Sequence, residues 1–136
     1  TPLAKLAREM AKNKLGAVLI SSHSNITYLT NYSGFSKEER EAYLLIVTQP
    51  QRLTHKTSEV LRYVLTAGRY TQAVKTLIPD FKLIEISPKL SFENAIKQLV
   101  KKHNIKRLGF EGHEVNFLEY KRIKKYFNNI YRLSIV

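Results

Sequence analysis

A chain of 136 residues is long enough to bury a hydrophobic core as one domain, and we expect a single domain over residues 1–136. The absence of cysteine excludes disulfides, thiol catalysis and cysteine-ligated zinc, and no apolar run has the length of a membrane-spanning helix. The net charge of +12 raises the question of a polyanionic partner, whereas Asp80 is the only aspartate, which disfavours a site that holds two metal ions between carboxylates.

The chain begins at Thr1 without an initiator methionine or an apolar targeting segment, and we expect a fragment of a longer protein. A chain without cysteine also fits a reducing compartment. We therefore expect a cytoplasmic protein without a membrane partner.

The first half of the chain predicts a helix followed by two buried strands. The helix covers residues 1–13, because Thr1 can cap it, Pro2 suits its first turn and apolar residues recur on one face. Ala17–Ile20 is a short apolar run typical of a buried strand, and Ala42–Thr48 predicts a central strand buried on both faces.

The segment between these two strands carries the functional hypotheses. Residues 22–25 are turn formers, while residues 26–29 are too apolar for a solvated loop and are expected to pack back on the sheet. Residues 31–36 form a predicted loop that carries Tyr32 and Phe35. These two aromatic side chains either form an exposed contact surface or tuck into their own domain.

The second half of the chain alternates predicted helices with predicted strands. Residues 52–62 are ambiguous, because Thr57 could cap a helix whereas residues 63–66 could equally form a strand. The other predicted elements are a helix over 70–78, a strand over 81–86, a helix from Ser91 to 103, a strand over 107–111, a helix from 116 to 127 with a capping box to Glu119 and Phe117 on its buried stripe, and a strand over 130–136. This alternation predicts a three-layer α/β domain.

Two groups of polar residues could carry chemistry. The Ser-His-Ser run at 22–24 lacks the glycine pattern of a nucleophile elbow, so turn capping explains it better. Glu111, His113 and Glu114 follow a predicted strand, where sites of α/β proteins often lie. Polar residues at a helix entry are the better explanation, because neighbouring residues of a regular element face different ways. We expect no catalytic residue and no metal ligand in this chain.

Basic residues are densest in two places, 101–107 and 121–125. Solvated helix faces explain most such clusters, and binding to nucleic acid is the main alternative. The tyrosines and phenylalanines mostly fall at expected core positions, and they are not interleaved with arginine as in a base-stacking platform.

Three segments of the chain carry a family resemblance. Residues 25–30 run Asn-Ile-Thr-Tyr-Leu-Thr, residues 66–73 run Thr-Ala-Gly-Arg-Tyr-Thr-Gln-Ala, and residues 108–111 run Leu-Gly-Phe-Glu. In this order they resemble the Asn-x-x-Tyr-Leu-Thr-Gly-Phe, Thr-Asp-Gly-Arg-Tyr and Ile-Gly-Val-Glu segments of the creatinase/prolidase/Xaa-Pro aminopeptidase family. The chain departs from the family at Asn31-Tyr32, where the family has Gly-Phe, at Ala67, where it has Asp, and over 50–62, which is longer than usual.

The resemblance implies a ribonuclease H-like domain with a mixed sheet of about six strands flanked by helices. It also implies the amino-terminal domain of a proline-specific (Xaa-Pro) metallopeptidase, a hydrolase whose separate catalytic domain holds two divalent metal ions, manganese or cobalt. Contacts with that catalytic domain, a homodimer, and a lid loop at residues 31–41 near the partner's active site follow from the same resemblance. The alternative is a catalytically dead relative whose basic surface binds nucleic acid or an acidic protein.

The resemblance assigns roles to individual residues as well. The residues expected near the substrate or at a dimer contact are Asn31, Tyr32, Gly34, Phe35 and Arg69. The motif residues expected to support the fold are Asn25, Tyr28, Leu29, Gly68, Tyr70, Gly109 and Glu111.

Overall fold

The computed structural model describes residues 1–49, 60–111, 117–126 and 130–133. The elements in chain order are α1 (Pro2–Lys12), β1 (Ala17–Ile20), α2 (His23–Thr30), β2 (Ala42–Thr48), β3 (Val60–Ala67), the 3-10 turn η1 (Gly68–Tyr70), α3 (Thr71–Leu77), β4 (Lys82–Ile86), α4 (Phe92–Lys102), β5 (Leu108–Glu111), α5 (Phe117–Tyr126) and β6 (Ile130–Leu133).

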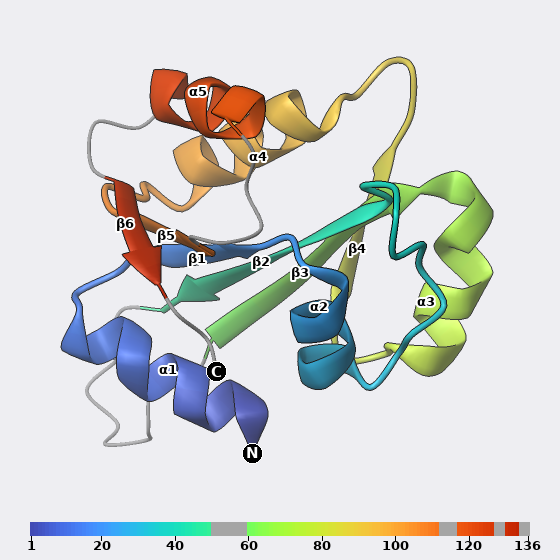
Figure 1. Cartoon of the computed structure of the whole chain (residues 1–136), viewed down its shortest axis with the longest axis horizontal. Coiled ribbons are helices and arrows are strands. Elements are labelled where there is room, and N and C mark those ends of the chain that lie inside the picture. The colour runs from blue at the N-terminus through green and yellow to red at the C-terminus, as the bar shows by residue number, and fades with distance from the viewer. Residues whose placement is uncertain (50–59, 112–116, 127–129, 134–136) are drawn as a thin grey trace.

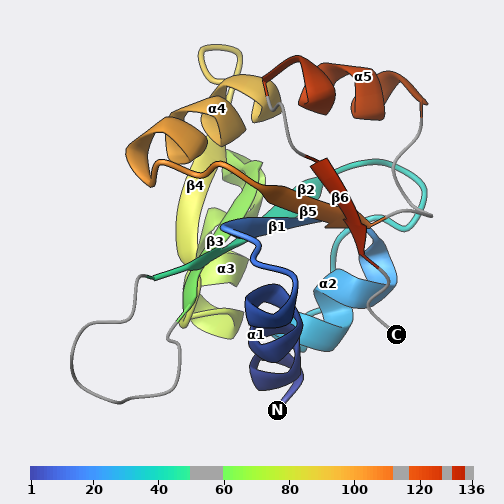
Figure 2. The ribbon, with the colours of Figure 1, turned by 90° about the vertical axis from the view of Figure 1, so that its left-hand side faces the viewer.

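The strands form one six-stranded sheet in the order β4-β3-β2-β1-β5-β6. β2 pairs antiparallel with both of its neighbours, and the other pairs are parallel, so the sheet is mixed. Helices α1, α2 and α3 cover one face of the sheet, and α4 and α5 cover the other (Figure 1, Figure 2). The three-layer α/β architecture with a mixed sheet is therefore confirmed.

The inner strands β1 and β2 form the centre of the core. Every residue of β1 is buried, as are those of β2 up to Val47. Successive side chains of a strand point to opposite faces. Val18 and Ile20 therefore pack toward α1, α2 and α3, whereas Ala17 and Leu19 pack toward α4. The prediction of a central strand buried on both faces is confirmed for β2.

Local capping signals were predicted correctly for α1 and α4. The Thr1 hydroxyl accepts a hydrogen bond from the Ala4 N–H at 3.1 Å, and Pro2 occupies the first turn of α1. The Ser91 hydroxyl accepts a hydrogen bond from the Asn94 N–H at 3.1 Å. Each cap satisfies a backbone donor that has no partner within the helix itself.

The segment predicted as a packed loop after β1 is the helix α2. It begins after Ser22, whose hydroxyl accepts a hydrogen bond from the Asn25 N–H at 3.1 Å, so the capping role expected for this serine is correct. Ile26 and Leu29 are buried, but Tyr28 is 52% exposed. Residues three apart share one face of a helix, and Tyr28 lies outside the face that Ile26 and Leu29 share. The expected packing of Tyr28 against the sheet was therefore wrong.

The ambiguous part of the chain is a strand wherever it is described. β3 runs antiparallel beside β2, with Thr66 opposite Ala42 and Val60 opposite Thr48. Of the segment 50–62, which is longer than usual for the family, residues 60–62 belong to β3, and residues 50–59 lie outside the described residues.

The last helix differs from its prediction. Phe117, which was expected on the buried stripe of α5, is 69% exposed. The proposed capping-box residue Asn116 lies outside the described residues, as do His113 and Glu114. Among the helices of the described part of the chain, none combines the length and the apolarity that crossing a bilayer requires.

Candidate functional site

A cleft of about 1240 Å³ opens at the end of the sheet where β1 stops and β2 begins. Its walls come from the start of α2, the loop between α2 and β2, and the amino-terminal parts of α4 and α5. The polar side chains that line it include Ser22, His23, Arg40, Glu41, Glu119 and Arg122. Strand ends of this kind are where α/β proteins commonly place their functional sites.

A buried carboxylate holds one wall of the cleft. Glu111, 3% exposed at the end of β5, accepts hydrogen bonds from the N–H groups of Ser21 and Ser22, the latter at 2.8 Å. It also accepts from the Ser22 hydroxyl at 2.6 Å and from the Asn25 side-chain amide. The donors sit at the amino terminus of α2, where the helix dipole favours a negative charge. Glu111 therefore supports α2, whereas the sequence had suggested that it serves the helix after β5.

Arg40 connects the loop to the two sides of the cleft. Its Nε and Nη2 atoms donate to the two carboxylate oxygens of Glu119 in α5 at 3.1 and 3.0 Å, and Nη1 donates to the Ser21 carbonyl. Burial acts to lower the pKa of Arg40, but the hydrogen bond and the charge of Glu119 outweigh it, and the pKa is raised. Such a bidentate ion pair fixes the relative orientation of the two side chains better than a single contact does.

Tyr43, the second residue of β2, adds a hydrogen bond to this ion pair. Its hydroxyl donates a hydrogen bond to the Glu119 carboxylate. Burial, together with the hydrogen bond and the negative charge of Glu119, raises the pKa of Tyr43. The phenol therefore stays protonated and remains a donor at neutral pH.

Glu41 closes the loop between α2 and β2. Its carboxylate accepts a hydrogen bond from the Ser36 N–H and pairs with Arg69 of η1. Hydrogen bonds from Tyr70 and from the Ser36 backbone, together with the charge of Arg69, lower the pKa of Glu41. Arg69 is 66% exposed, so the basic end of the pair faces solvent. This chain has Ala67 where the family that it resembles has Asp, so it lacks the carboxylate that could pair with Arg69 from that position. Glu41 supplies a carboxylate for Arg69 instead.

The aromatic residues of the loop pack inward. Phe35 is 5% exposed, and its ring makes edge-on contacts with Tyr32 and Tyr70 at centroid separations of 4.9 Å. The half-buried Tyr32 ring lies over Gly34, where any larger side chain would collide with it. Of the two interpretations of these rings, the one that tucks them into their own domain is correct for Phe35.

The exposed part of the loop is polar. Asn31, Gly34 and residues 37–39 are exposed, and Asn31 ends α2 in the left-handed conformation with φ of 60°. Asparagine tolerates this conformation better than most residues. The His23 Nε2 atom lies 3.1 Å from the Ser33 carbonyl oxygen, which attaches the loop to the start of α2. The surface that the loop offers is therefore the run Lys37-Glu38-Glu39 and not its aromatic rings.

Sequence reasoning missed three charged residues of this site, Arg40, Glu41 and Glu119. Residues 37–39 are exposed, but Arg40 and Glu41, which follow them directly, are half-buried. A usable signal was present, because Arg40 and Glu41 directly precede a strand that is buried on both faces. Charged groups at such a position need partners, since an unpaired buried charge is strongly unfavourable.

The described residues hold no group of three or more His, Asp or Glu side chains that could bind a metal ion. Two of the cleft carboxylates are engaged by basic side chains: Glu119 by Arg40 and Glu41 by Arg69. The site therefore positions a loop and shapes a cleft, and its described residues do not fit a metal centre.

The sequence was compared with known families and proteins. A model of the creatinase/prolidase N-terminal domain matches residues 2–135. The chain belongs to this family. A search of curated proteins finds no match.

Solved structures share the fold of this creatinase/prolidase N-terminal domain. The N-terminal domain of the cytoplasmic peptidase PepQ from Mycobacterium tuberculosis H37Rv is 22% identical with a TM-score of 0.71, over 98% of this chain and 92% of that chain. The Xaa-Pro aminopeptidase from Streptococcus thermophilus is 22% identical with a TM-score of 0.74, over 98% and 90%. The Xaa-Pro dipeptidase from Bacillus anthracis is 14% identical with a TM-score of 0.74, over 98% of this chain but 34% of that chain.

Two of the three segments that carry the family resemblance are in direct contact beside the cleft of this creatinase/prolidase N-terminal domain, and the third pairs with the loop that lines the cleft. Asn25 of the first segment and Glu111 of the third share a hydrogen bond, and Arg69 of the second pairs with Glu41 at the base of the loop. Their joint effect is structural, because they fix α2, β5 and the loop relative to one another.

The glycines of these segments lie where a side chain would not fit. A Cβ atom at Gly109 would come within 2.8 Å of Leu15 Cδ1 and 3.1 Å of Val18 Cγ2, and one at Gly68 would meet the Glu85 carboxylate. Gly109 therefore allows β5 to approach the residues that lead into β1.

Proposed function

We propose that this chain is the non-catalytic amino-terminal domain of a metal-dependent Xaa-Pro aminopeptidase or dipeptidase. Membership of the creatinase/prolidase N-terminal domain family and the likeness to solved Xaa-Pro peptidases support this role. The two divalent metal ions, manganese or cobalt, then belong to a catalytic domain elsewhere in the protein, since the described residues do not fit a metal centre. The domain contacts that catalytic domain and takes part in a homodimer.

Within this role, the loop of residues 31–41 acts as a preformed wall beside the active site of the partner subunit. The observation that carries this proposal is that the loop is held at several points along its length while its tip is exposed. His23 and Glu41 bind backbone groups of the loop, and the Arg40 side chain ties the end of the loop to the Ser21 carbonyl. Phe35 anchors the loop in the core. A wall of this kind limits the access of long peptides without having to be ordered when substrate binds.

The exposed tip is the part of the wall that would meet a substrate or the partner. Lys37→Ala combined with Glu38→Ala in the full-length enzyme should raise the KM for Xaa-Pro peptides severalfold, or shift the dimer toward monomer, without changing the melting temperature. Lys5→Ala combined with Glu9→Ala is the matched control, because it removes one exposed cation and one exposed anion from α1 on a different surface.

Two results would contradict the proposal. If the tip variant keeps the KM, the substrate range and the sedimentation coefficient of the parent, the loop tip has no role in substrate access or in the dimer. Turnover of an Xaa-Pro dipeptide by the 136-residue chain with added Mn²⁺ or Co²⁺ would show that the domain is itself catalytic.

A further inference from the structure

One layer of the fold carries a large share of the chain's positive charge. Helices α4 and α5, side by side on one face of the sheet (Figure 1, Figure 2), contribute three and four basic residues, against a single glutamate each. Both glutamates already have cationic partners. Glu93 pairs with Arg122 at 3.1 Å, and Glu119 pairs with Arg40 at 3.0 Å. The layer therefore has a net positive charge that its own acids do not neutralise.

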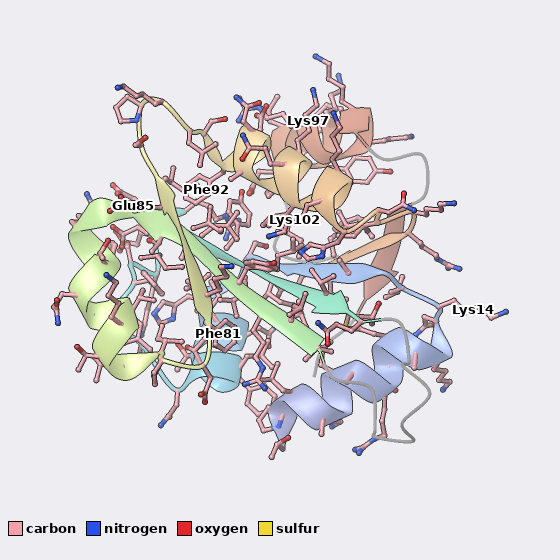
Figure 3. The ribbon with its side chains drawn as sticks, turned by 180° about the vertical axis from the view of Figure 1, so that it is seen from behind. Lys14, Phe81, Glu85, Phe92, Lys97 and Lys102 are labelled. Carbon is pink, nitrogen blue, oxygen red and sulfur yellow. The ribbon has the colours of Figure 1, made fainter. Side chains whose placement is uncertain are left out.

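The cations of the two helices form one surface. Lys97 and Lys101 lie on the same ridge of α4 as Glu93, because residues four apart are neighbours on a helix. Arg122 of α5 reaches Glu93, so this ridge of α4 faces α5. Figure 3 shows Lys97 on the outer side of the layer and Lys102 closer to the sheet. We call the exposed set the basic face: Lys97, Lys101, Lys121, Arg122, Lys124 and Lys125.

An exposed aromatic ring lies at the edge of the basic face. Phe117 is 69% exposed, and the Lys121 Nζ atom lies 4.7 Å from its ring centroid. Phe117 is therefore an exception to the expectation that the aromatic residues of this chain fall at core positions. A ring beside several cations is the combination with which proteins bind single strands, because bases stack on the ring while cations contact phosphates.

We propose that the basic face binds single-stranded nucleic acid, with Phe117 as a stacking platform and the cations of α4 and α5 along the phosphate backbone. Both helices lie flat on the sheet, so neither projects into a duplex groove as a recognition helix would. Among the described residues of α5, the exposed large apolar side chains are Phe117 and Leu118. Two such side chains give too little apolar surface for a helix that binds a membrane. The proposal goes beyond a role in peptidase action and does not depend on it.

The test is a fluorescence anisotropy titration of labelled oligothymidylate with the 136-residue chain, between about 50 and 200 mM salt. Affinity should fall with salt at a slope of about 0.7 per phosphate contacted. Replacing Lys121, Lys124 and Lys125 together with Gln should reduce that slope by about 2. Phe117→Ala should weaken binding about tenfold with little change in slope, because it removes stacking and no charge.

A charge-matched control separates a local site from general attraction. Replacing Lys5, Arg8 and Lys12 of α1 with Gln removes the same number of cations from the opposite layer and should leave the slope unchanged. If the α5 variant does not fold by circular dichroism, Lys97→Gln with Lys101→Gln tests the same face from α4.

Five results would overturn the proposal. The first is the absence of binding at the lower salt concentration, and the second is an equal loss of affinity in the α1 and α5 variants. The third is tighter binding to a duplex of the same length, and the fourth is an unchanged affinity in Phe117→Ala. The fifth is that polyglutamate or anionic phospholipid vesicles displace the labelled oligonucleotide more effectively, per unit of charge, than unlabelled oligothymidylate does.

Discussion

Replacing Glu111 with alanine tests the network that joins β5 to α2. The substitution removes the acceptor of two backbone N–H groups, those of Ser21 and Ser22, in residues that are each 2% exposed. A buried donor left without a partner costs about 1–3 kcal/mol, so the two together should destabilise the domain by about 4 kcal/mol. This is a large part of the roughly 5–15 kcal/mol by which a typical domain is stable.

Glu111→Gln separates the loss of an acceptor from the loss of charge. Glutamine keeps one carbonyl oxygen at the same distance from the backbone, so we expect a destabilisation of only about 1–2 kcal/mol. Glu9→Ala, at an exposed position of α1, is the control and should change stability by less than about 0.5 kcal/mol. Urea unfolding followed by circular dichroism, with an unchanged m-value, gives the three free energies.

If Glu111→Ala unfolds at the same urea concentration as Glu9→Ala, the Glu111 carboxylate contributes nothing to stability. A double-mutant cycle between Asn25→Ala and Glu111→Gln gives a second check. The two residues are in contact, so their coupling should exceed about 0.5 kcal/mol.

Three further predictions concern the loop and the core. The pKa of Glu41 is lowered in the folded state, so its stabilising effect is present above its ordinary value of 4.5 and is lost as pH falls through the folded pKa. Acid unfolding should therefore show a smaller loss of stability below pH 4.5 in Glu41→Gln than in the parent, and identical acid limbs would contradict this. Phe35→Ala should destabilise by about 3–5 kcal/mol because the ring is buried, whereas the exposed Tyr28→Ala should change stability by less than about 1 kcal/mol. Equal melting temperatures of these two variants would count against the burial of Phe35. Gly109→Ala should lower the free energy of unfolding by about 1–3 kcal/mol because its Cβ would crowd Leu15, and an unchanged urea midpoint would show that Leu15 can move aside.

Features with local signals could be predicted from the sequence. α1 and α4 each combine an apolar stripe with a capping hydroxyl at their start, Thr1 and Ser91. β1 and β2 are apolar runs bounded by glycine and by polar residues, which is typical of buried strands. The alternation of these elements was sufficient to predict the three layers, because a helix or a strand with one apolar side must cover another element.

Features that depend on distant contacts could not be predicted in the same way. The spacing of the apolar residues in β3 fits a helix and a strand equally, and only its pairing with β2 decides between them. Residues 23–30 form a helix whose amino terminus is supported by Glu111, 89 residues beyond Ser22. Arg40 and Glu119 are 79 residues apart, so no local pattern indicates their pairing.

The family resemblance predicted the fold well and the contact surface poorly. It identified Asn25 and Glu111, which share a hydrogen bond, and Arg69, which pairs with Glu41 of the loop, but it could not show which way a loop side chain points. Tyr28, which was expected to pack on the sheet, is exposed because α2 places it outside the face that Ile26 and Leu29 share. Phe35, for which both environments had been left open, is buried.

The position of β1 between β2 and β5 has a consequence for how the chain assembles during synthesis. β2 follows β1 closely in sequence, but β5, the other neighbour of β1, is made much later. Until then one edge of the most buried strand keeps its backbone donors and acceptors unpaired, and such an edge can capture strands from other molecules. A nascent chain that stalls before β5 is therefore the form of this domain most exposed to aggregation, whereas β5 covers that edge of β1 once it has been made.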